Sequence, residues 1–188
     1  MRRLFGRSPQ KLAAHVAYTA LVGQARAPVF YAELGVPDTL DGRFEMIVLH
    51  VFLVLHRVRE LPEARQFGQA LYDVLFADMD RALREMGTGD LSVGKQVKKM
   101  ATALAGRIQA YQAGLAGTED LSSALRRNLY GTIGEPDTQD LATMAQYLRS
   151  QETALARQSA ERLTSGIFSF APLPLDSGAP PSEIQDHD

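Results

Sequence analysis

The sequence predicts an all-α protein: a single domain of about six helices around a central apolar helix, ending in a short extended segment and a disordered acidic tail. Through most of the chain, apolar residues recur three and four positions apart, as they do in amphipathic helices. No segment has the alternating pattern of a half-buried strand. At 188 residues and 45% hydrophobic content, the chain is long enough to bury one core.

Three segments are expected along the chain. Residues 1–30 form a basic N-terminal helix with its connector, residues 31–170 form a helical domain, and residues 171–188 form the tail. From Pro172 onward the chain is rich in proline and serine and contains four acids but no Lys or Arg. A segment of this composition buries too little apolar surface to fold, so we expect the tail to be disordered.

The first helix is expected to begin at Pro9, because Ser8 is a favoured N-cap and proline is favoured at the first helical position. It should run to about Gln24. A connector with glycine and proline follows over residues 28–39.

The central helix is predicted over residues 40–59, with Asp38 or Thr39 as its cap. Its apolar residues cover almost the whole circumference: Phe44, Met46, Ile47, Val48, Leu49, Val51, Phe52, Leu53, Val54 and Leu55. A helix that is apolar on all sides is normally surrounded by other helices. This helix is therefore expected at the centre of the fold.

Four further helices are predicted over residues 62–86, 93–113, 118–131 and 138–163. Pro62 opens the first of them, a glycine-rich stretch ends it after Met86, and Ser92 caps the second. Residues 167–175 are expected to form a short extended segment laid on the core.

Two carboxylates of the predicted helix 62–86 fall on its apolar side. At 100° per residue, Asp78 and Glu85 lie within about 20° of Phe67. A buried carboxylate needs a cation or hydrogen-bond donors, which Arg43, His50, Lys95 or Lys98 would supply. Such an internal ion pair is one interpretation, and a polar groove for a partner is another. A general acid–base pair is the least supported, because nothing nearby resembles a nucleophile.

The next predicted helix has a lysine face, formed by Lys95, Lys98 and Lys99, opposite its apolar face. Cations near a helix N-terminus oppose the helix dipole by about 0.3–1 kcal/mol each, so some compensation is expected. Asp90, acids of a neighbouring helix or simple solvation would provide it. The alternative is that the lysines face a partner: an acidic protein, ribosomal RNA or lipid headgroups.

Residues 89–95 (GDLSVGK) satisfy half of a phosphate-loop motif, which makes nucleotide binding a weak alternative function. Gln96 stands where the motif needs Ser or Thr for magnesium, and a helix precedes the segment where the motif needs a buried strand. The glycines Gly89 and Gly94 are better explained as a helix stop and a turn.

No metal or cofactor is expected. The chain has no cysteine, and His50 and His56 are six residues apart, so they do not share a face of the helix. We interpret His50 as a hydrogen-bonded core residue. The net charge of −2 provides no general field for nucleic acid, and no DNA partner is expected.

The N-terminus is basic: residues 1–32 contain five bases and no acid. Four of these bases are candidates for contact with an anionic membrane: Arg2, Arg3, Arg7 and Lys11. An export signal is disfavoured, because Lys11 and His15 interrupt the apolar region and Pro28 would follow the cleavage site. We expect a cytoplasmic protein, or one peripheral on the cytoplasmic face of the inner membrane.

Several blocks of the sequence resemble the ubiquinol–cytochrome c chaperone family. One lies between Gly35 and Arg59 and contains the sequence LHVF at residues 49–52. The others are Asp78…Met86-Gly87…Lys98-Lys99…Gly106, ALRRNLY at residues 124–130 and QYL at residues 146–148. The similarity runs from about Tyr31 to about Phe170, and it rests on the order and spacing of these blocks.

The resemblance implies an all-α fold without enzymatic activity. Mitochondrial members of the family assist assembly of respiratory complex III, bind newly made cytochrome b, act with a small helical partner and work near the ribosomal tunnel exit. This chain resembles a bacterial relative. We therefore expect an assembly chaperone for cytochrome b or another complex III subunit, with a generic membrane-surface scaffold as the alternative. The polar residues expected to form the partner surface are Asp38, Asp41, Arg43, Glu45, Asp78, Glu85, Asp90, Lys95, Lys98 and Lys99.

Overall fold

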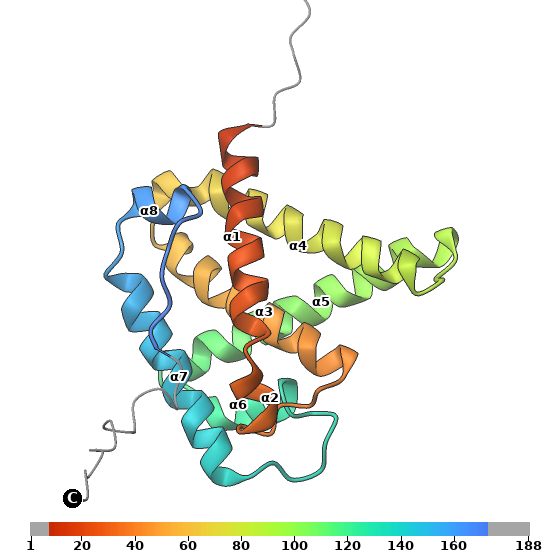
Figure 1. Ribbon diagram of the computed structural model, residues 1–188, viewed down its shortest axis with the longest axis vertical. Helices are drawn as coiled ribbons and strands as arrows, with labels where there is room; N and C mark the ends of the chain where they lie inside the picture. Colours follow the sequence, from red (N-terminus) through yellow and green to blue (C-terminus); the bar gives the residue numbers. More distant parts are fainter. Residues whose placement is uncertain (1–7, 173–188) are drawn as a thin grey trace, which may run out of the picture.

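A computed structural model describes residues 8–172 and shows a single all-α domain, as predicted (Figure 1). The helices are α1 (Pro9–Ala25), α2 (Pro28–Ala32), α3 (Leu40–Arg59), a 3₁₀ turn η1 (Pro62–Ala64), α4 (Arg65–Glu85), α5 (Asp90–Leu115), α6 (Leu121–Asn128), α7 (Thr138–Ala156) and α8 (Ala160–Thr164). This range contains no strand. Arg2, Arg3, Arg7 and most of the expected acidic tail lie outside the described residues.

The central helix is α3, as its composition predicts. Helices α1, α4, α5 and α7 all pack against it, and α1 runs across its front in Figure 1. Thr39 caps α3, because its hydroxyl accepts a hydrogen bond from the backbone N–H of Gly42 at 3.1 Å. The residues from Met46 to Val54 are all buried. Helix α1 also contributes core residues, including Ala14, Ala17 and Leu21, so it is part of the same domain.

A hydrogen-bonded chain across the core joins α1, α3 and α7. His50 is fully buried, and its Nδ1 lies 2.7 Å from the carbonyl oxygen of Met46. A carbonyl only accepts, so Nδ1 carries the proton and Nε2 accepts from the hydroxyl of Tyr147 at 2.8 Å. Gln24 donates to the same hydroxyl at 3.1 Å. Burial lowers the pKa of His50 to about 4, so the ring is neutral at neutral pH, as expected for a core histidine.

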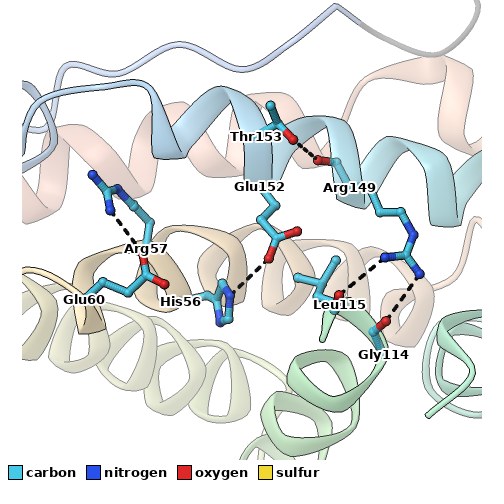
Figure 2. A network of polar contacts seen from close by, with 8 residues as sticks. All are labelled: His56, Arg57, Glu60, Gly114, Leu115, Arg149, Glu152 and Thr153. Carbon is cyan, nitrogen blue, oxygen red and sulfur yellow. Dashed lines mark hydrogen bonds and ion pairs between the residues drawn. The ribbon is translucent and has the colours of Figure 1, made fainter. Parts of the chain in front are cut away.

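A second polar network joins α7 to α3 and to the end of α5, as Figure 2 shows. Glu152 lies 3.3 Å from Nε2 of His56, and Arg149 donates to the carbonyl oxygens of Gly114 and Leu115. Carbonyls at a helix C-terminus have no partner within the helix, so the guanidinium both caps α5 and ties it to α7. These contacts hold α7 against α3 and the end of α5.

The extended segment predicted after residue 166 is present as far as residue 172, where the described chain ends. Two glutamines hold it, Gln151 in α7 and Gln158 just after that helix, each through a pair of hydrogen bonds to one residue of the segment. Gln158 bonds the backbone N–H and carbonyl of Ser169 at 2.9 and 2.6 Å, and Gln151 bonds those of Ala171 at 2.7 and 3.1 Å. The side-chain amides thus do what a neighbouring strand would do in a sheet.

Several helix boundaries differ from the prediction, including those of α6, which spans Leu121–Asn128 and not residues 118–131. The connector before α3 contains the short helix α2, which begins at Pro28. The predicted helix 138–163 is two helices, because Ser159 caps α8 with its hydroxyl and the chain turns before it. Helix α5 begins at Asp90, three residues earlier than predicted, with Gly89 in place of Ser92 as its cap. No helix among residues 8–172 is long and apolar enough to cross a membrane.

Candidate functional site

A groove opens between the first half of α3 and the hairpin of α4 and α5. In Figure 1 these two helices leave the rest of the bundle together and meet at the right edge of the view. The groove has a volume of about 570 Å³, and residues of the chain between α6 and α7 line it as well. It is the candidate site because it brings together apolar side chains and several of the polar residues singled out from the sequence.

The walls of the groove are mainly apolar and rich in methionine. The apolar lining residues are Leu40, Phe44, Ile47, Val48, Met79, Ala82, Leu83, Met86, Met100, Ala103, Leu104 and Leu129. Two of them are exposed large side chains, Leu40 at 65% and Met86 at 55%. Methionine is unbranched and polarisable, so a surface that contains several of them adapts to partners of different shape.

An ion pair between Glu45 of α3 and Arg107 of α5 lies in the groove lining. Arg107 Nε donates to Glu45 Oε2 at 2.6 Å, and its Nη2 donates to the other carboxylate oxygen. The Glu45 side chain is 9% exposed. Its burial raises the pKa of Glu45, and the contact with Arg107 opposes that rise. Glu45 was predicted as a site residue, but Arg107 was not. Arg107 lies twelve residues after Lys95 and outside the lysine face on which the prediction was based.

Asp78 lies at the edge of the groove and not in the core. It accepts a hydrogen bond from the Tyr18 hydroxyl at 2.8 Å and pairs with Arg81 one turn along α4. Burial, and then the bond to Asp78, raises the pKa of Tyr18. None of the four cations named from the sequence is its partner.

Glu85 is not on the apolar face, contrary to the sequence analysis. Its side chain is 72% exposed, and Arg81 lies 4.0 Å away. The large buried side chains of α4 are four residues apart: Phe67, Leu71, Leu75, Met79 and Leu83. Each step of four residues turns the buried face by about 40°, so by the end of α4 that face has left the direction of Phe67. A fixed arc measured from Phe67 therefore misplaced Glu85.

The lysine face is exposed, as predicted. Lys95, Lys98 and Lys99 are all exposed, and Lys99 lines the groove. No ion pair joins any of the three to another residue that the structure describes. Because α5 begins at Asp90, Lys95 is its sixth residue and lies beyond the first turn. The dipole penalty expected from the sequence is therefore small, since it fades within that turn.

Of the remaining predicted site residues, one lines the groove and the others do not. Asp41 lines it, whereas Asp38 and Arg43 pair with each other at 2.6 Å on the exposed start of α3. The Arg43 guanidinium lowers the pKa of Asp38. Asp90 is the first residue of α5, and its side chain lies outside what the structure describes. The structure thus gathers Asp41, Glu45, Asp78 and Lys99 at the groove, but not Asp38, Arg43, Glu85, Lys95 or Lys98.

The segment 89–95 does not form a phosphate loop. Gly94 and Lys95 lie inside α5, and α4 precedes the turn. A phosphate loop needs successive free backbone N–H groups after a strand, which a continuous helix does not offer. Within residues 8–172 no group of three or more His, Asp or Glu is placed to hold a metal ion.

An all-α domain with an open, methionine-lined groove and charges around it has the architecture of a helical binding protein. Comparison with known sequences narrows this class. The model of the ubiquinol–cytochrome c chaperone family matches residues 32–170, so the chain belongs to that family. The resemblance noted in the sequence is thereby confirmed, and the expected lack of enzymatic activity agrees with the family's description as chaperones.

Curated relatives and a solved structure agree with this assignment. The chain is 34% identical over 152 residues to protein CBP3, mitochondrial, of Saccharomyces cerevisiae, covering 78% of this chain and 45% of that protein. It is 26% identical over 166 residues to human ubiquinol–cytochrome c reductase complex assembly factor 1, covering 87% and 55%. The crystal structure of the Cbp3 homolog from Brucella abortus matches with a TM-score of 0.79 and 34% identity, covering 89% of this chain and 93% of that one. This chain spans about half the length of the yeast and human proteins.

Proposed function

We propose that this protein is an assembly chaperone for ubiquinol–cytochrome c reductase, and that it holds an apolar helical segment of a newly made subunit in the groove between α3, α4 and α5. Cytochrome b is the client that the family resemblance implies. The human relative is named as an assembly factor of this complex, which supports the proposal. This chain covers about half of the yeast and human relatives, so the function is argued from this domain alone.

The methionine-lined groove is the observation that carries the proposal. A subunit of a membrane complex exposes apolar helices until it is assembled, and such a helix binds by laying its apolar face into a groove. The groove already exposes Leu40 and Met86, which a client segment would cover. Its volume of about 570 Å³ suits a few apolar side chains of a segment, not a whole helix.

The polar residues at the groove are proposed to hold it open and to orient the client. The Glu45–Arg107 pair ties α3 to α5 at the groove. Asp41 and Asp78 lie on the α3 and α4 side, and Lys99 lies on α5. Charges of opposite sign on two sides of an apolar groove favour one orientation of a bound helix over the other.

The groove is tested by filling it with side chains. Ala82 and Ala103 are exposed and face the groove from α4 and α5, so replacing both by Trp fills the space without touching the core. The matched control replaces Ala77 and Ala105 by Trp; these two residues are exposed on the same two helices but do not line the groove. Each tagged full-length protein is isolated in mild detergent from membranes of cells that make complex III, and co-purified cytochrome b is quantified.

We expect the Ala82→Trp/Ala103→Trp protein to recover at least about tenfold less cytochrome b than the control does. The loss of a few apolar contacts with the client costs more than about 1.4 kcal/mol of binding free energy, which corresponds to a factor of ten in affinity. Equal recovery by both variants would remove the groove from the argument. Recovery of no complex III subunit by wild-type protein would contradict the chaperone function itself. Unchanged thermal unfolding of the variants shows that the fold is intact.

The lysine face is proposed as a second contact, with an anionic partner. Lys95, Lys98 and Lys99 project from the hairpin without ion-pair partners among the described residues. Replacing all three by Glu is expected to reduce partner binding and to leave helicity unchanged, as circular dichroism would show. Binding that survives the triple change would restrict the contact to the groove.

A further inference from the structure

The second half of α5 is held firmly to the rest of the molecule. Arg107 pairs with Glu45 of α3, and Tyr111, one turn further on, is fully buried. The carbonyl oxygen of Leu115, at the end of the helix, accepts a hydrogen bond from Arg149 of α7. Helix α6 also packs against α5. This half is therefore fixed by three other helices.

The first half of α5 has far weaker ties. From residue 92 to residue 103, Val93 is the only buried side chain that the structure describes, and it lies outside the main core. Among the described residues, no hydrogen bond or ion pair joins positions 92–105 to another helix. A segment with so few buried contacts is displaced at little cost in free energy. This half nevertheless forms one wall of the groove, through Gln96, Lys99, Met100 and Ala103.

Glycines lie at both ends of this half. The turn that leads into it from α4 contains Gly87 and Gly89, and Gly87 has a φ of 81°, a conformation that favours glycine. At the other end, a Cβ on Gly106 would meet no atom within 4 Å, so packing does not require glycine there. Gly114 is different, because its Cβ would lie 2.7 Å from the Leu121 side chain. Glycine weakens a helix interior relative to alanine, so α5 has a weak point where its fixed half begins.

We infer that the first half of α5, residues 90–105, is a movable wall of the groove that swings away from α3 to admit the client segment. It turns on Gly106 and on the turn between α4 and α5. Helix α4 stays in place, because it packs against α1 and its Asp78 accepts a hydrogen bond from Tyr18 of that helix. In Figure 1 the first half of α5 runs out with α4 to the right edge of the view, away from the other helices.

The inference rests on the proposed function of the groove and answers a question of size. The groove of about 570 Å³ takes only a few apolar side chains. An α-helix with its side chains is about 10–12 Å across, so a client helix needs more room than the closed groove offers. Displacement of a lightly held wall provides that room without breaking the Glu45–Arg107 pair, which lies in the fixed half.

The motion is measured between two spin labels, which attach only at chosen positions because the chain has no cysteine. Arg43→Cys and Thr102→Cys place the labels at exposed positions of α3 and of the movable wall, and neither residue lines the groove. Double electron–electron resonance gives the distribution of distances between the labels, in the free protein and in protein purified with cytochrome b. We expect a main distance and a longer one in the free protein, and chiefly the longer one with the client bound.

Two alanine variants of the labelled protein separate turning at Gly106 from a general loosening of α5. Gly106→Ala makes a bend at this position less favourable, so the population with the longer distance should fall about two- to fivefold. Gly94→Ala is the matched control, because Gly94 also has open space at its Cβ position but lies inside the wall. This control should leave the distribution unchanged. Melting temperatures no lower than that of wild type would show that both variants keep the fold.

Three results would overturn the inference. The first is a single narrow distance in the free protein, and the second is a distance that bound cytochrome b does not lengthen. The third is an equal effect of the two alanine variants, or no effect of either, because the wall would then not turn at Gly106.

Failure of the chaperone function itself would look different. Wild-type protein would then recover no cytochrome b from membranes, while the free protein would still show both distances and their dependence on Gly106. If the function holds and the wall moves, the Gly106→Ala protein should recover about two- to fivefold less cytochrome b than the Gly94→Ala protein.

Discussion

The two halves of α3 use their polar residues in different ways. In the second half, His50 and His56 are enclosed by α7, and the groups around them bond one another across the core. In the first half, Glu45 has a partner in Arg107, but the residues around it line an open groove. The enclosed half shows how buried polar groups fix a helix packing. The open half shows a polar pair that holds two helices together and leaves the space between them available.

The largest effect is expected from breaking the pair in the open half. Arg107→Leu leaves the buried Glu45 carboxylate without its cation, which costs about 3–5 kcal/mol of unfolding free energy. The double variant Glu45→Leu/Arg107→Leu removes both charges and is expected to recover most of that loss. Urea unfolding of wild type, the two single variants and the double variant measures the coupling free energy between the two side chains. A single variant as stable as wild type would mean that the pair does not join the two helices.

Acid is expected to weaken the enclosed half. His50 has a folded pKa of about 4, below the ordinary histidine pKa of 6.5, so between these two pH values the unfolded chain binds more protons than the folded one. The contribution is complete above pH 6.5 and falls by roughly 3 kcal/mol as the pH drops to about 4. Unfolding free energies of wild type and His50→Gln, measured across this range, should differ in slope. Parallel curves would show that His50 takes up its proton without penalty.

A smaller effect is expected from one hydroxyl of the same network. Tyr147→Phe removes the donor to His50 and the acceptor of Gln24, which leaves a buried ring nitrogen unpaired and costs about 2 kcal/mol. Tyr72→Phe is the control, because the Tyr72 ring stacks on Phe76 at 4.5 Å and its hydroxyl has no side-chain bond in the described structure. Similar melting temperatures for the two variants would contradict the importance of the network.

The smallest effect on stability is expected at the lysine face. Replacing Lys95, Lys98 and Lys99 by Gln should change the unfolding free energy by less than about 0.5 kcal/mol, because all three are exposed, unpaired among the described residues and beyond the first turn of α5. Urea unfolding provides the measurement. A loss of more than 1 kcal/mol would show a structural role for the lysines and weaken the case for a partner.

The fold was largely predictable because its helix boundaries depend on local chemistry. The limits of α3 follow from the Thr39 cap and a continuous apolar run, and those of α1 from Ser8 and Pro9. The short helices α2 and α8 were not foreseen, because five residues contain too little periodicity to recognise.

The site was predictable only in part. Glu45 and Lys99 were found as charges near helix ends, but the partner of Glu45 depends on how α5 crosses α3, which no local pattern records. Glu85 was misplaced because the buried face of α4 turns by about 40° with each step of four residues, which a fixed arc measured from Phe67 does not follow. The exposed Leu40 and Met86 were also missed, because an apolar residue looks alike in the sequence whether another helix covers it or not.

The two glutamines that hold the extended segment, Gln151 of α7 and Gln158 just after it, limit how the sequence can vary. Within the clamped segment, Gln151 and Gln158 bond backbone atoms of Ala171 and Ser169 and not their side chains, so the side chains at those two positions are free to change, with proline as the exception because it has no N–H. The glutamines have no such freedom, since glutamate lacks the donor and leucine lacks both groups. Variation among relatives should therefore concentrate on the clamped segment and spare the two residues that hold it.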